Sequence, residues 1–325
     1  MEKLFKDLVN KSSSIVVTTH LHPDADGIGS QIALSIGLRS LGKNCFCVNE
    51  EPLLERYEYM DPDNHVMCFD EYIKQSENSE IDLFIVTDTN NLNRIGQRMG
   101  SLVHKAKNLL FIDHHPCPKE LAAIHCIDTS TAATGELVGS LLESVDVKFT
   151  KEIALPLYTA ILIDTSSFRY PSVSGETHRM VAKLLDAGVE PPTAYNSIYG
   201  TKKISYMQLL GRILASAQTT EDETIAWMTL NEGDLSEFNV DSEDTLGFIN
   251  NLLILNKIKV ACMFRQEGHN VKISFRSAGD VDVGIIAQAL GGGGHNHSAA
   301  TLIEGKLDDV VGRTIQKLKI MLSED

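Results

Sequence analysis

Residues 14–30, SIVVTTHLHPDADGIGS, combine a strand pattern, a turn and the start of a helical pattern. Ser14–His20 is a continuous apolar strand pattern, and after a turn Gly27–Leu41 has the periodicity of an amphipathic helix. Further strand patterns follow with helical patterns between several of them: Asn44–Asn49, Val66–Phe69, Leu83–Thr87, Leu109–Asp113 and Ile124–Ile127. Short apolar strands separated by helices are typical of a parallel sheet covered on both faces. Helical periodicity then dominates residues 131–187.

The second half of the chain has a different pattern. Residues 191–215 begin with two prolines and contain three basic residues and no acidic one, so we expect a helical connector there. Three strand patterns follow, at Ile225–Leu230, Ile258–Arg265 and Val271–Phe275. After them come a helical pattern at Val281–Leu290, a glycine run, a strand pattern at Ala300–Ile303 and a C-terminal helix. The sequence therefore predicts an α/β protein with a parallel-sheet domain over 1–190, a helical connector over 191–215, and a smaller mixed-sheet α/β domain over 216–325 that faces the first across a cleft.

Composition excludes several classes of protein. The formal net charge of −15 disfavours a broad basic face for long nucleic acid, because phosphate binding depends on Lys and Arg. The longest apolar run, Ile153–Ile163, is shorter than the ~20 residues that span a bilayer. The N-terminus has no apolar signal-peptide core, and six cysteines without a CxxC pair suggest reduced thiols. We expect a cytoplasmic protein with no membrane contact, and a homo-oligomer is compatible with the sequence.

Four apolar segments each end in an Asp or His. VVTT is followed by His20, LFIV by Thr87-Asp88-Thr89-Asn90, LLFI by Asp113-His114-His115, and AILI by Asp164-Thr165. In open α/β sheets, ligands bind at the carboxyl ends of the strands. Several carboxylates gathered there would repel one another without a cation, so this pattern favours a metal site.

Each of these residues also has a simpler interpretation. Asp24 or Asp26 alone is commonly an N-cap, Asp88 alone a turn residue, and His114 alone a core histidine. An EF-hand calcium loop is rejected, since its glycine and terminal Glu are missing. Taken together, carboxylates and imidazoles without Cys favour two divalent ions that share a bridging Asp. Mn²⁺ is the expected ion, with Mg²⁺ or Co²⁺ as alternatives.

The motifs HxxPDADGxGS, DTN, DHH and the later Asp-Thr resemble, in this order, the four motifs of the DHH phosphoesterase family. The GGGGH motif at residues 291–295 resembles the DHH-associated C-terminal domain of that family. Size and domain pairing are most similar to the bacterial nanoRNase/pAp phosphatases, an exopolyphosphatase-related group.

The resemblance implies a role for each matching residue. One metal would be held by His20, Asp24 and Asp88, and the other by Asp26, Asp88, His114 and Asp164, so that Asp88 bridges the two. The resemblance implies that Asp113 is an outer group or weaker ligand, and that His115 lies beside the scissile phosphate as charge stabiliser or proton donor. We accordingly count Asp88, Asp113 and His115 as catalytic.

The C-terminal half carries the predicted substrate contacts. Gly292, Gly293 and Gly294 with His295 suit close approach of the backbone to a phosphate or nucleobase, although a glycine run can be only a flexible loop. Arg265 and Arg276 lie on neighbouring strand patterns and match phosphate geometry, although either is also compatible with an exposed sheet face. Arg169 resembles a family position near Asp164, where a structural salt bridge is an equal alternative. Ala300 stands where the family usually has a glycine after the GGGH motif, so the turn expected at that position would be less tight.

We expect a two-metal phosphodiesterase that hydrolyses very short oligoribonucleotides to 5′-mononucleotides and 3′-phosphoadenosine 5′-phosphate (pAp) to AMP. Its partners are short RNA or small nucleotides, not long nucleic acid. One alternative is an inorganic pyrophosphatase or polyphosphatase. The negative net charge of residues 216–325 disfavours it. A phosphodiesterase for cyclic or linear dinucleotides is a second alternative. A non-catalytic nucleotide-binding regulator would not need so many metal-type ligands.

Overall fold

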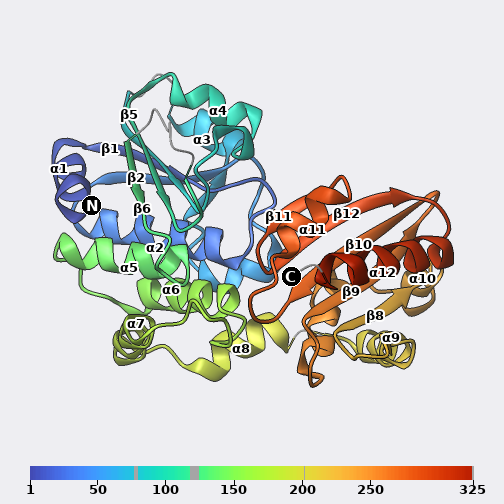
Figure 1. The fold of residues 1–325 in the computed structure, drawn as a ribbon. Coiled ribbons are helices and arrows are strands. Elements are labelled where there is room, and N and C mark those ends of the chain that lie inside the picture. The colour runs from blue at the N-terminus through green and yellow to red at the C-terminus, as the bar shows by residue number, and fades with distance from the viewer. Residues whose placement is uncertain (77–79, 118–123, 201, 324–325) are drawn as a thin grey trace. The chain divides into compact units, whose positions relative to one another are not determined.

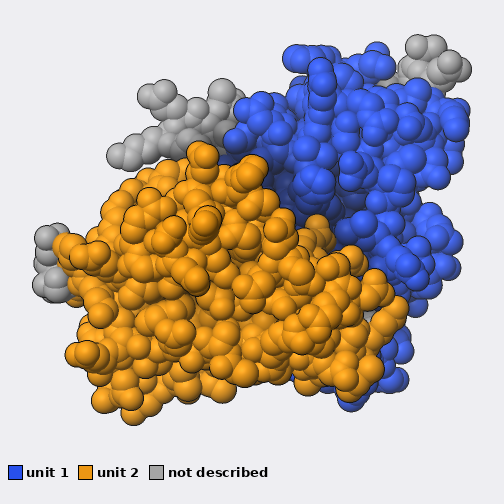
Figure 2. All heavy atoms as spheres, turned by 90° about the vertical axis from the view of Figure 1, so that its right-hand side faces the viewer, with its two compact units in different colours: residues 1–201 blue, residues 202–325 orange. Residues whose placement is uncertain are grey.

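The fold is taken from a computed structural model that describes residues 1–76, 80–117, 124–200 and 202–323. The chain divides into two compact units, Met1–Thr201 and Lys202–Asp325, which Figure 2 distinguishes by colour. The division falls inside the stretch for which a helical connector is expected, between α8 (Pro191–Tyr199) and α9 (Ile204–Ala215). The three-part organisation with its connector stays a prediction. In the described residues, no helix is long and apolar enough to span a membrane.

Unit 1 is built on a parallel six-stranded sheet with the strand order β3-β2-β1-β4-β5-β6 (Figure 1). Its strands are β1 (Ser14–Thr18), β2 (Asn44–Asn49), β3 (Val66–Cys68), β4 (Ile81–Thr87), β5 (Ala106–Asp113) and β6 (Ile124–Ile127). The order reverses direction between β1 and β4, which pair in parallel with Val16 opposite Phe84. Such a switch point opens a crevice at the carboxyl ends of the strands, where ligands of open α/β sheets bind.

Helices cover both faces of this sheet. The helices of unit 1 are α1 (Glu2–Lys11), α2 (Ala25–Ser40), α3 (Phe69–Gln75), α4 (Gln97–Val103), α5 (Thr134–Ser144), α6 (Lys151–Asp164), α7 (Gly175–Asp186) and α8. Alternate strand residues define the two cores: Ile15 and Val17 pack with α1, α2, α5 and α6, whereas Val16 packs with α3 and α4. This alternation explains why the strands are apolar on both sides, and the predicted parallel α/β sheet is confirmed.

Unit 2 contains a mixed six-stranded sheet with the order β11-β12-β10-β9-β8-β7. The strands are β7 (Gln218–Thr219), β8 (Ile225–Leu230), β9 (Val260–Glu267), β10 (Asn270–Ser277), β11 (Gly293–His295) and β12 (Ser298–Glu304). β8 and β9 are parallel and the other pairs are antiparallel. The helices α11 (Val283–Ala289) and α12 (Leu307–Ser323) pack on one face, and α9 with the 3₁₀ helix η3 (Ser242–Ile254) packs on the other.

The structure adds elements that the hydrophobic pattern does not predict. The helix α10 (Asp234–Phe238) and the two-residue β7 are too short to show a periodicity, and η3 is a 3₁₀ helix, whose three-residue turn departs from the 3.6-residue pattern. β11 forms inside the glycine run, where pairing with β12 rather than side-chain pattern defines the strand.

Candidate active site

The candidate site of unit 1 lies at the switch point of the sheet. His20 follows β1, Asp88 follows β4 directly, and Asp113 is the last residue of β5. The Asp88 backbone has a φ of +61° and its amide donates to Ile112 O at 2.9 Å. Asp is one of the few residues that tolerate this left-handed conformation, so the chain turns at Asp88 and presents its carboxylate at the sheet edge.

Three overlapping groups of ligand-type side chains form here: His20, Asp24 and Asp88; Asp26, His114 and Asp164; and Asp88, His114 and His115. Within each group, one potential ligand atom per residue lies within 4.8 Å of the others. The structure therefore brings together all six residues predicted to bind metal, with His115 beside them. Asp113 belongs to none of these groups. The assignment of each residue to one ion or the other stays a prediction.

The first turn of α2 supplies two of the carboxylates. Asp24 is the N-cap of α2, and its Oδ1 accepts hydrogen bonds from the amides of Asp26 at 3.0 Å and Gly27 at 3.1 Å. The capping interpretation of Asp24 is thus correct, and the same residue also belongs to a ligand group. Gly27 permits the close approach, because a Cβ there would lie 2.5 Å from Thr19 Oγ1 and 3.3 Å from Asp88 Oδ2.

Two of these carboxylates are buried almost completely. Asp26 is 1% exposed and Asp88 is 2% exposed. Burial is the main reason that the pKa of Asp88 is raised well above its ordinary value, and the charges of Asp26, Asp24, Asp164 and Asp113 raise it further. Burial also raises the pKa of Asp26. Carboxylates that resist ionisation in this way would be stabilised in their charged form by a divalent cation.

Asp164 reaches the cluster from a helix and not from a strand. It is the last residue of α6, so only three of the four apolar segments that end in site residues belong to the sheet. A carboxylate at a helix C-terminus opposes the helix dipole. Burial, followed by the charges of Asp26, Asp24 and Asp113, raises the pKa of Asp164 to about 9. This position is unfavourable for an anion unless a cation is near.

One buried nitrogen provides direct support for a metal. His114 Nδ1 lies 3.4 Å from Thr131 O, and among the described residues its buried Nε2 has no hydrogen-bond partner. That Nε2 lies 3.3 Å from Asp164 Oδ2 and 3.9 Å from Asp26 Oδ2. Metal-bound histidines usually donate the other ring N–H to a carbonyl or carboxylate, which fits this geometry. The residues present therefore fit a divalent ion.

His20 has the same arrangement on the other side of the cluster. Its Nδ1 lies 2.8 Å from Leu21 O, and its Nε2 lies 3.4 Å from Asp88 Oδ2. Burial is the largest influence on the pKa of His20 and lowers it, and the positive charge of Arg94 acts in the same direction. A neutral imidazole is the form that binds metals.

His115 is held by Asp113. Asp113 Oδ1 accepts from the His115 amide at 3.2 Å and lies 2.8 Å from His115 Nδ1, while its Oδ2 accepts from Asn90 Nδ2 at 2.9 Å. Burial alone would lower the pKa of His115, but the hydrogen bond and charge of Asp113 outweigh it and raise the pKa. This pair can supply a protonated imidazole beside Asp88, whose Oδ1 lies 3.8 Å from His115 Nδ1.

The predicted substrate arginines differ in their surroundings. Arg265 is 7% exposed; its Nε donates to Glu267 Oε1 at 2.7 Å and its Nη1 to Ser242 O at 3.1 Å. Both of these partners lie in unit 2. Arg276 is half-buried, and strand register places it opposite Ser298, which in turn lies opposite His295. The side chain of His295 is outside what the structure describes. The substrate roles of these residues stay predictions.

The glycine run approaches a neighbouring strand. A Cβ on Gly292 would lie 2.2 Å from Ala300 O, and a Cβ on Gly294 would lie 2.4 Å from Ala299 Cα. Around Gly293 there is open space. Ala300 lies inside β12 and pairs with Gly293, so no turn exists at the position where the family usually has glycine.

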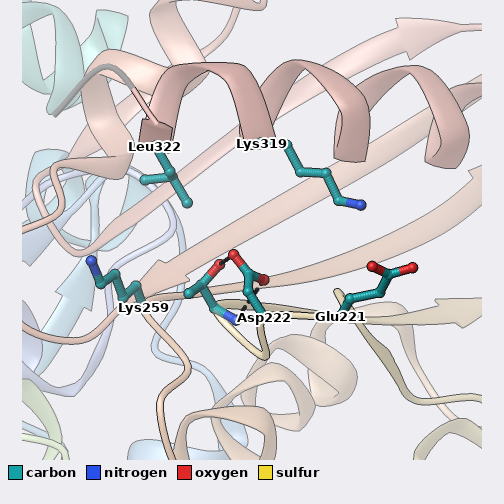
Figure 3. Close-up of a pocket in the computed structure, with 6 residues that line it drawn as sticks. Glu221, Asp222, Lys259, Lys319 and Leu322 are labelled. Atoms are coloured by element: carbon teal, nitrogen blue, oxygen red, sulfur yellow. Dashed lines mark hydrogen bonds between the residues drawn. The ribbon is translucent and has the colours of Figure 1, made fainter.

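Two further features lie outside the cluster. Arg169 is exposed and donates within its own loop, to Ser166 O at 2.9 Å and to Ser166 Oγ at 2.8 Å, and its substrate role stays a prediction. Unit 2 has a pocket of about 490 Å³, lined by Glu221, Asp222, Thr224, Lys259, Lys319 and Leu322. Figure 3 shows the side chains that line it. Its described lining mixes both charge signs and includes none of the predicted substrate contacts.

Sequence reasoning missed three residues beside the cluster. The Thr134 hydroxyl donates to Asp88 Oδ1 at 2.9 Å, and Asn90 binds Asp113 as described. Arg94, in the 3₁₀ helix Leu92–Arg94, is exposed and its carbonyl accepts from Leu21 N at 2.5 Å. Asn90 could have been found, since it is the last residue of the DTN motif. Thr134 and Arg94 have no local signal, because their contacts are distant in sequence.

The chain is similar to known proteins over most of its length. The chain matches the DHH family, N-terminal domain, over residues 14–161 and the DHHA1 domain over residues 223–320. It is 30% identical to the bifunctional oligoribonuclease and PAP phosphatase NrnA of Thermus thermophilus over 94% of this chain and 89% of that protein. The NrnA of Bacillus subtilis is 29% identical over 87% of each chain. The crystal structure of an exopolyphosphatase-related protein from Bacteroides fragilis has a TM-score of 0.88, 26% identity, and coverage of 99% of this chain and 97% of its own.

Proposed function

Because this chain belongs to the DHH family of phosphoesterases and carries both its N-terminal and its DHHA1 domain, we propose that it hydrolyses very short oligoribonucleotides to 5′-mononucleotides and pAp to AMP. The bifunctional relatives from Thermus thermophilus and Bacillus subtilis support this choice of substrates. The observation that carries it is the buried His114 Nε2, which faces Asp26 and Asp164 without a hydrogen-bond partner in the described residues.

Two divalent ions, Mn²⁺ by preference, would be held by the six ligands of the cluster. His20, Asp24 and Asp88 would hold one ion, and Asp26, Asp88, His114 and Asp164 the other. Oxygen and imidazole ligands without thiolates suit Mn²⁺, Mg²⁺ or Co²⁺ better than structural zinc. When bound, such a pair supplies positive charge at the scissile phosphate and activates the attacking water.

The remaining groups would act on the substrate directly. His115, which Asp113 orients and keeps charged, would stabilise the developing negative charge or donate a proton to the leaving oxygen. Arg94, exposed next to the His20 turn, offers a cation to the incoming phosphate. Arg276, His295 and the open backbone at Gly293 would hold the end of the nucleotide distal to the metals.

The preference for short substrates follows from charge. A net charge of −15 disfavours a broad basic track along which long RNA could be held. Residues 216–325 contain nine basic and 17 acidic residues, which disfavours bare polyphosphate as the main substrate. Affinity must then come from a few fixed contacts, which suits substrates of a few nucleotides.

A parallel assay tests the proposal. Purified protein with Mn²⁺ is given a dinucleotide, a long RNA, pAp and polyphosphate, and products are separated by chromatography. We expect 5′-mononucleotides from the dinucleotide and AMP from pAp, with little product from long RNA or polyphosphate. Hydrolysis of polyphosphate alone would contradict the proposal. Anomalous scattering at the manganese edge should find two ions per chain, and a single tetrahedral zinc would contradict the two-metal site.

A further inference from the structure

The start of helix α5 is joined to the candidate site. The first amides of a helix have no partners within the helix, and the N-cap Ala133 offers no side-chain acceptor. The Thr134 amide donates to Asp26 Oδ2 and the Gly135 amide donates to Asp26 Oδ1, both at 2.8 Å. Asp26, from the first turn of α2, therefore serves as the acceptor that α5 lacks.

Thr134 makes a second contact through its side chain. Its hydroxyl donates to Asp88 Oδ1 at 2.9 Å, and the residue is completely buried. Asp88 Oδ2 lies on the His20 side, 3.4 Å from Nε2. Thr134 thus binds Asp26 with its backbone and Asp88 with its hydroxyl, although Asp26 comes from helix α2 and Asp88 follows strand β4.

The position of Thr134 is itself fixed by packing. A Cβ on Gly135 would lie 2.5 Å from Ala160 Cβ, so α5 and α6 are in direct contact at this point. Glu136, which is 4% exposed, accepts from the Ala132 amide at 2.9 Å and from Thr177 Oγ1 at 3.0 Å. The turn that leads into α5 is therefore held on both sides of Thr134.

We infer that Thr134 is a positioning residue that sets the orientation of Asp88 relative to Asp26 before metal binds, an inference that rests on the two-metal function proposed above. The hydroxyl engages one oxygen of Asp88 and leaves the other on the His20 side. Outer hydrogen bonds of this kind orient metal ligands, and their loss typically lowers metal affinity about 10–100-fold.

The test compares variants with and without a hydroxyl at position 134. Thr134→Val removes the hydroxyl at nearly constant volume, and Thr134→Ser keeps it. Thr159→Val is a matched control, because Thr159 is also completely buried but its hydroxyl interacts with Tyr59 at 3.3 Å, outside the cluster. The readout is calorimetric titration of Mn²⁺ into metal-free protein without substrate, together with the thermal midpoint of the metal-free form.

We expect Thr134→Val to bind at least one Mn²⁺ about 10–100-fold more weakly, with Thr134→Ser and Thr159→Val close to the wild type. Equal Mn²⁺ affinity for Thr134→Val and the wild type would overturn the inference and leave the proposed function intact. Failure of the wild type itself to bind Mn²⁺ would instead contradict the proposed function. If Thr134→Val does not fold, Thr134→Ala takes its place, and wild-type affinity in that variant would overturn the inference equally.

Discussion

Buried charge has opposite surroundings in the two units of the molecule. In unit 2, Arg265 lies in the middle of a sheet and has Glu267 and a backbone carbonyl as partners. In unit 1, Asp88 lies among Asp26, Asp24, Asp164 and Asp113, all of the same sign, and these charges add to burial in raising its pKa. His114 Nε2 beside it has no hydrogen-bond partner among the described residues.

This difference distinguishes a buried charge that already has its partners from a cluster of like charges. A buried ion that is paired and hydrogen-bonded contributes to packing and needs nothing further. A buried cluster of like charges is costly and persists where a ligand stabilises it. The following predictions test whether the contrast between Asp88 and Arg265 reflects function.

The largest effect is expected for Asp88→Ala. Because Asp88 belongs to two of the three ligand groups, its removal should reduce kcat to background on every substrate and abolish Mn²⁺ binding in calorimetry. Asp82→Ala is the matched control, since Asp82 lies at the other end of the same strand, β4. Full Mn²⁺ binding by Asp88→Ala would mean that the cluster is not the metal site.

His115→Ala should give a smaller loss that is confined to the chemical step. One positioned proton donor or charge stabiliser is commonly worth ~10²–10⁴-fold in kcat. Mn²⁺ titration should be nearly unchanged, and the exposed His104→Ala is the control. If His115→Ala instead removes the metals, His115 is a ligand and its assigned role is wrong. Asp113→Asn should also lower kcat, but by a smaller factor than His115→Ala, because Asp113 acts through His115.

Arg276→Ala and Arg265→Ala should separate substrate binding from structure in unit 2. For Arg276→Ala, we expect KM for a dinucleotide to rise about 10–100-fold, the value of one charge-assisted contact to phosphate, while a small aryl phosphodiester is hydrolysed as before. Arg265→Ala should lower the free energy of unfolding, because it removes a buried side chain together with its hydrogen bonds to Glu267 and to Ser242 O. An equal loss on both substrates for Arg276→Ala would assign Arg276 to the fold or the metal site.

The smallest effect concerns Asp82, whose carboxylate is well satisfied. Hydrogen bonds from the amides of Ser13 and Ser14, with Lys107 near, lower the pKa of Asp82 to about 2. Because the pKa of Asp82 is lower in the folded protein than in the unfolded chain, the ionised carboxylate stabilises the fold at pH values above the unfolded-state pKa. This stabilisation is lost as the pH falls through the pKa of Asp82 in the folded protein. Asp82→Asn should therefore cost about 1 kcal/mol in urea unfolding at neutral pH. That difference should disappear between about pH 4 and pH 2, and a constant difference would show that ionisation is not involved.

Much of the site could be predicted from sequence because its signals are local. An apolar run that ends in His20, Asp88 or Asp113 identifies a strand and a polar carboxyl end within a few residues. Asp24 and Asp26 follow in the next turn, so residue type and spacing alone indicate a metal-binding edge.

The fold class and the residues of the cluster could therefore be inferred from the chain alone, because hydrophobic periodicity and strand-end chemistry extend over short stretches of sequence. Three features became visible only in the folded chain: Asp164 lies at a helix end, Thr134 contacts Asp26 at a separation of 108 residues, and Arg265 is paired. The folded chain also shows that β11 forms within the glycine run, since its pairing with β12 is backbone to backbone. The physical reason is that hydrogen-bond partners and burial are set by packing between distant segments, which no local pattern records.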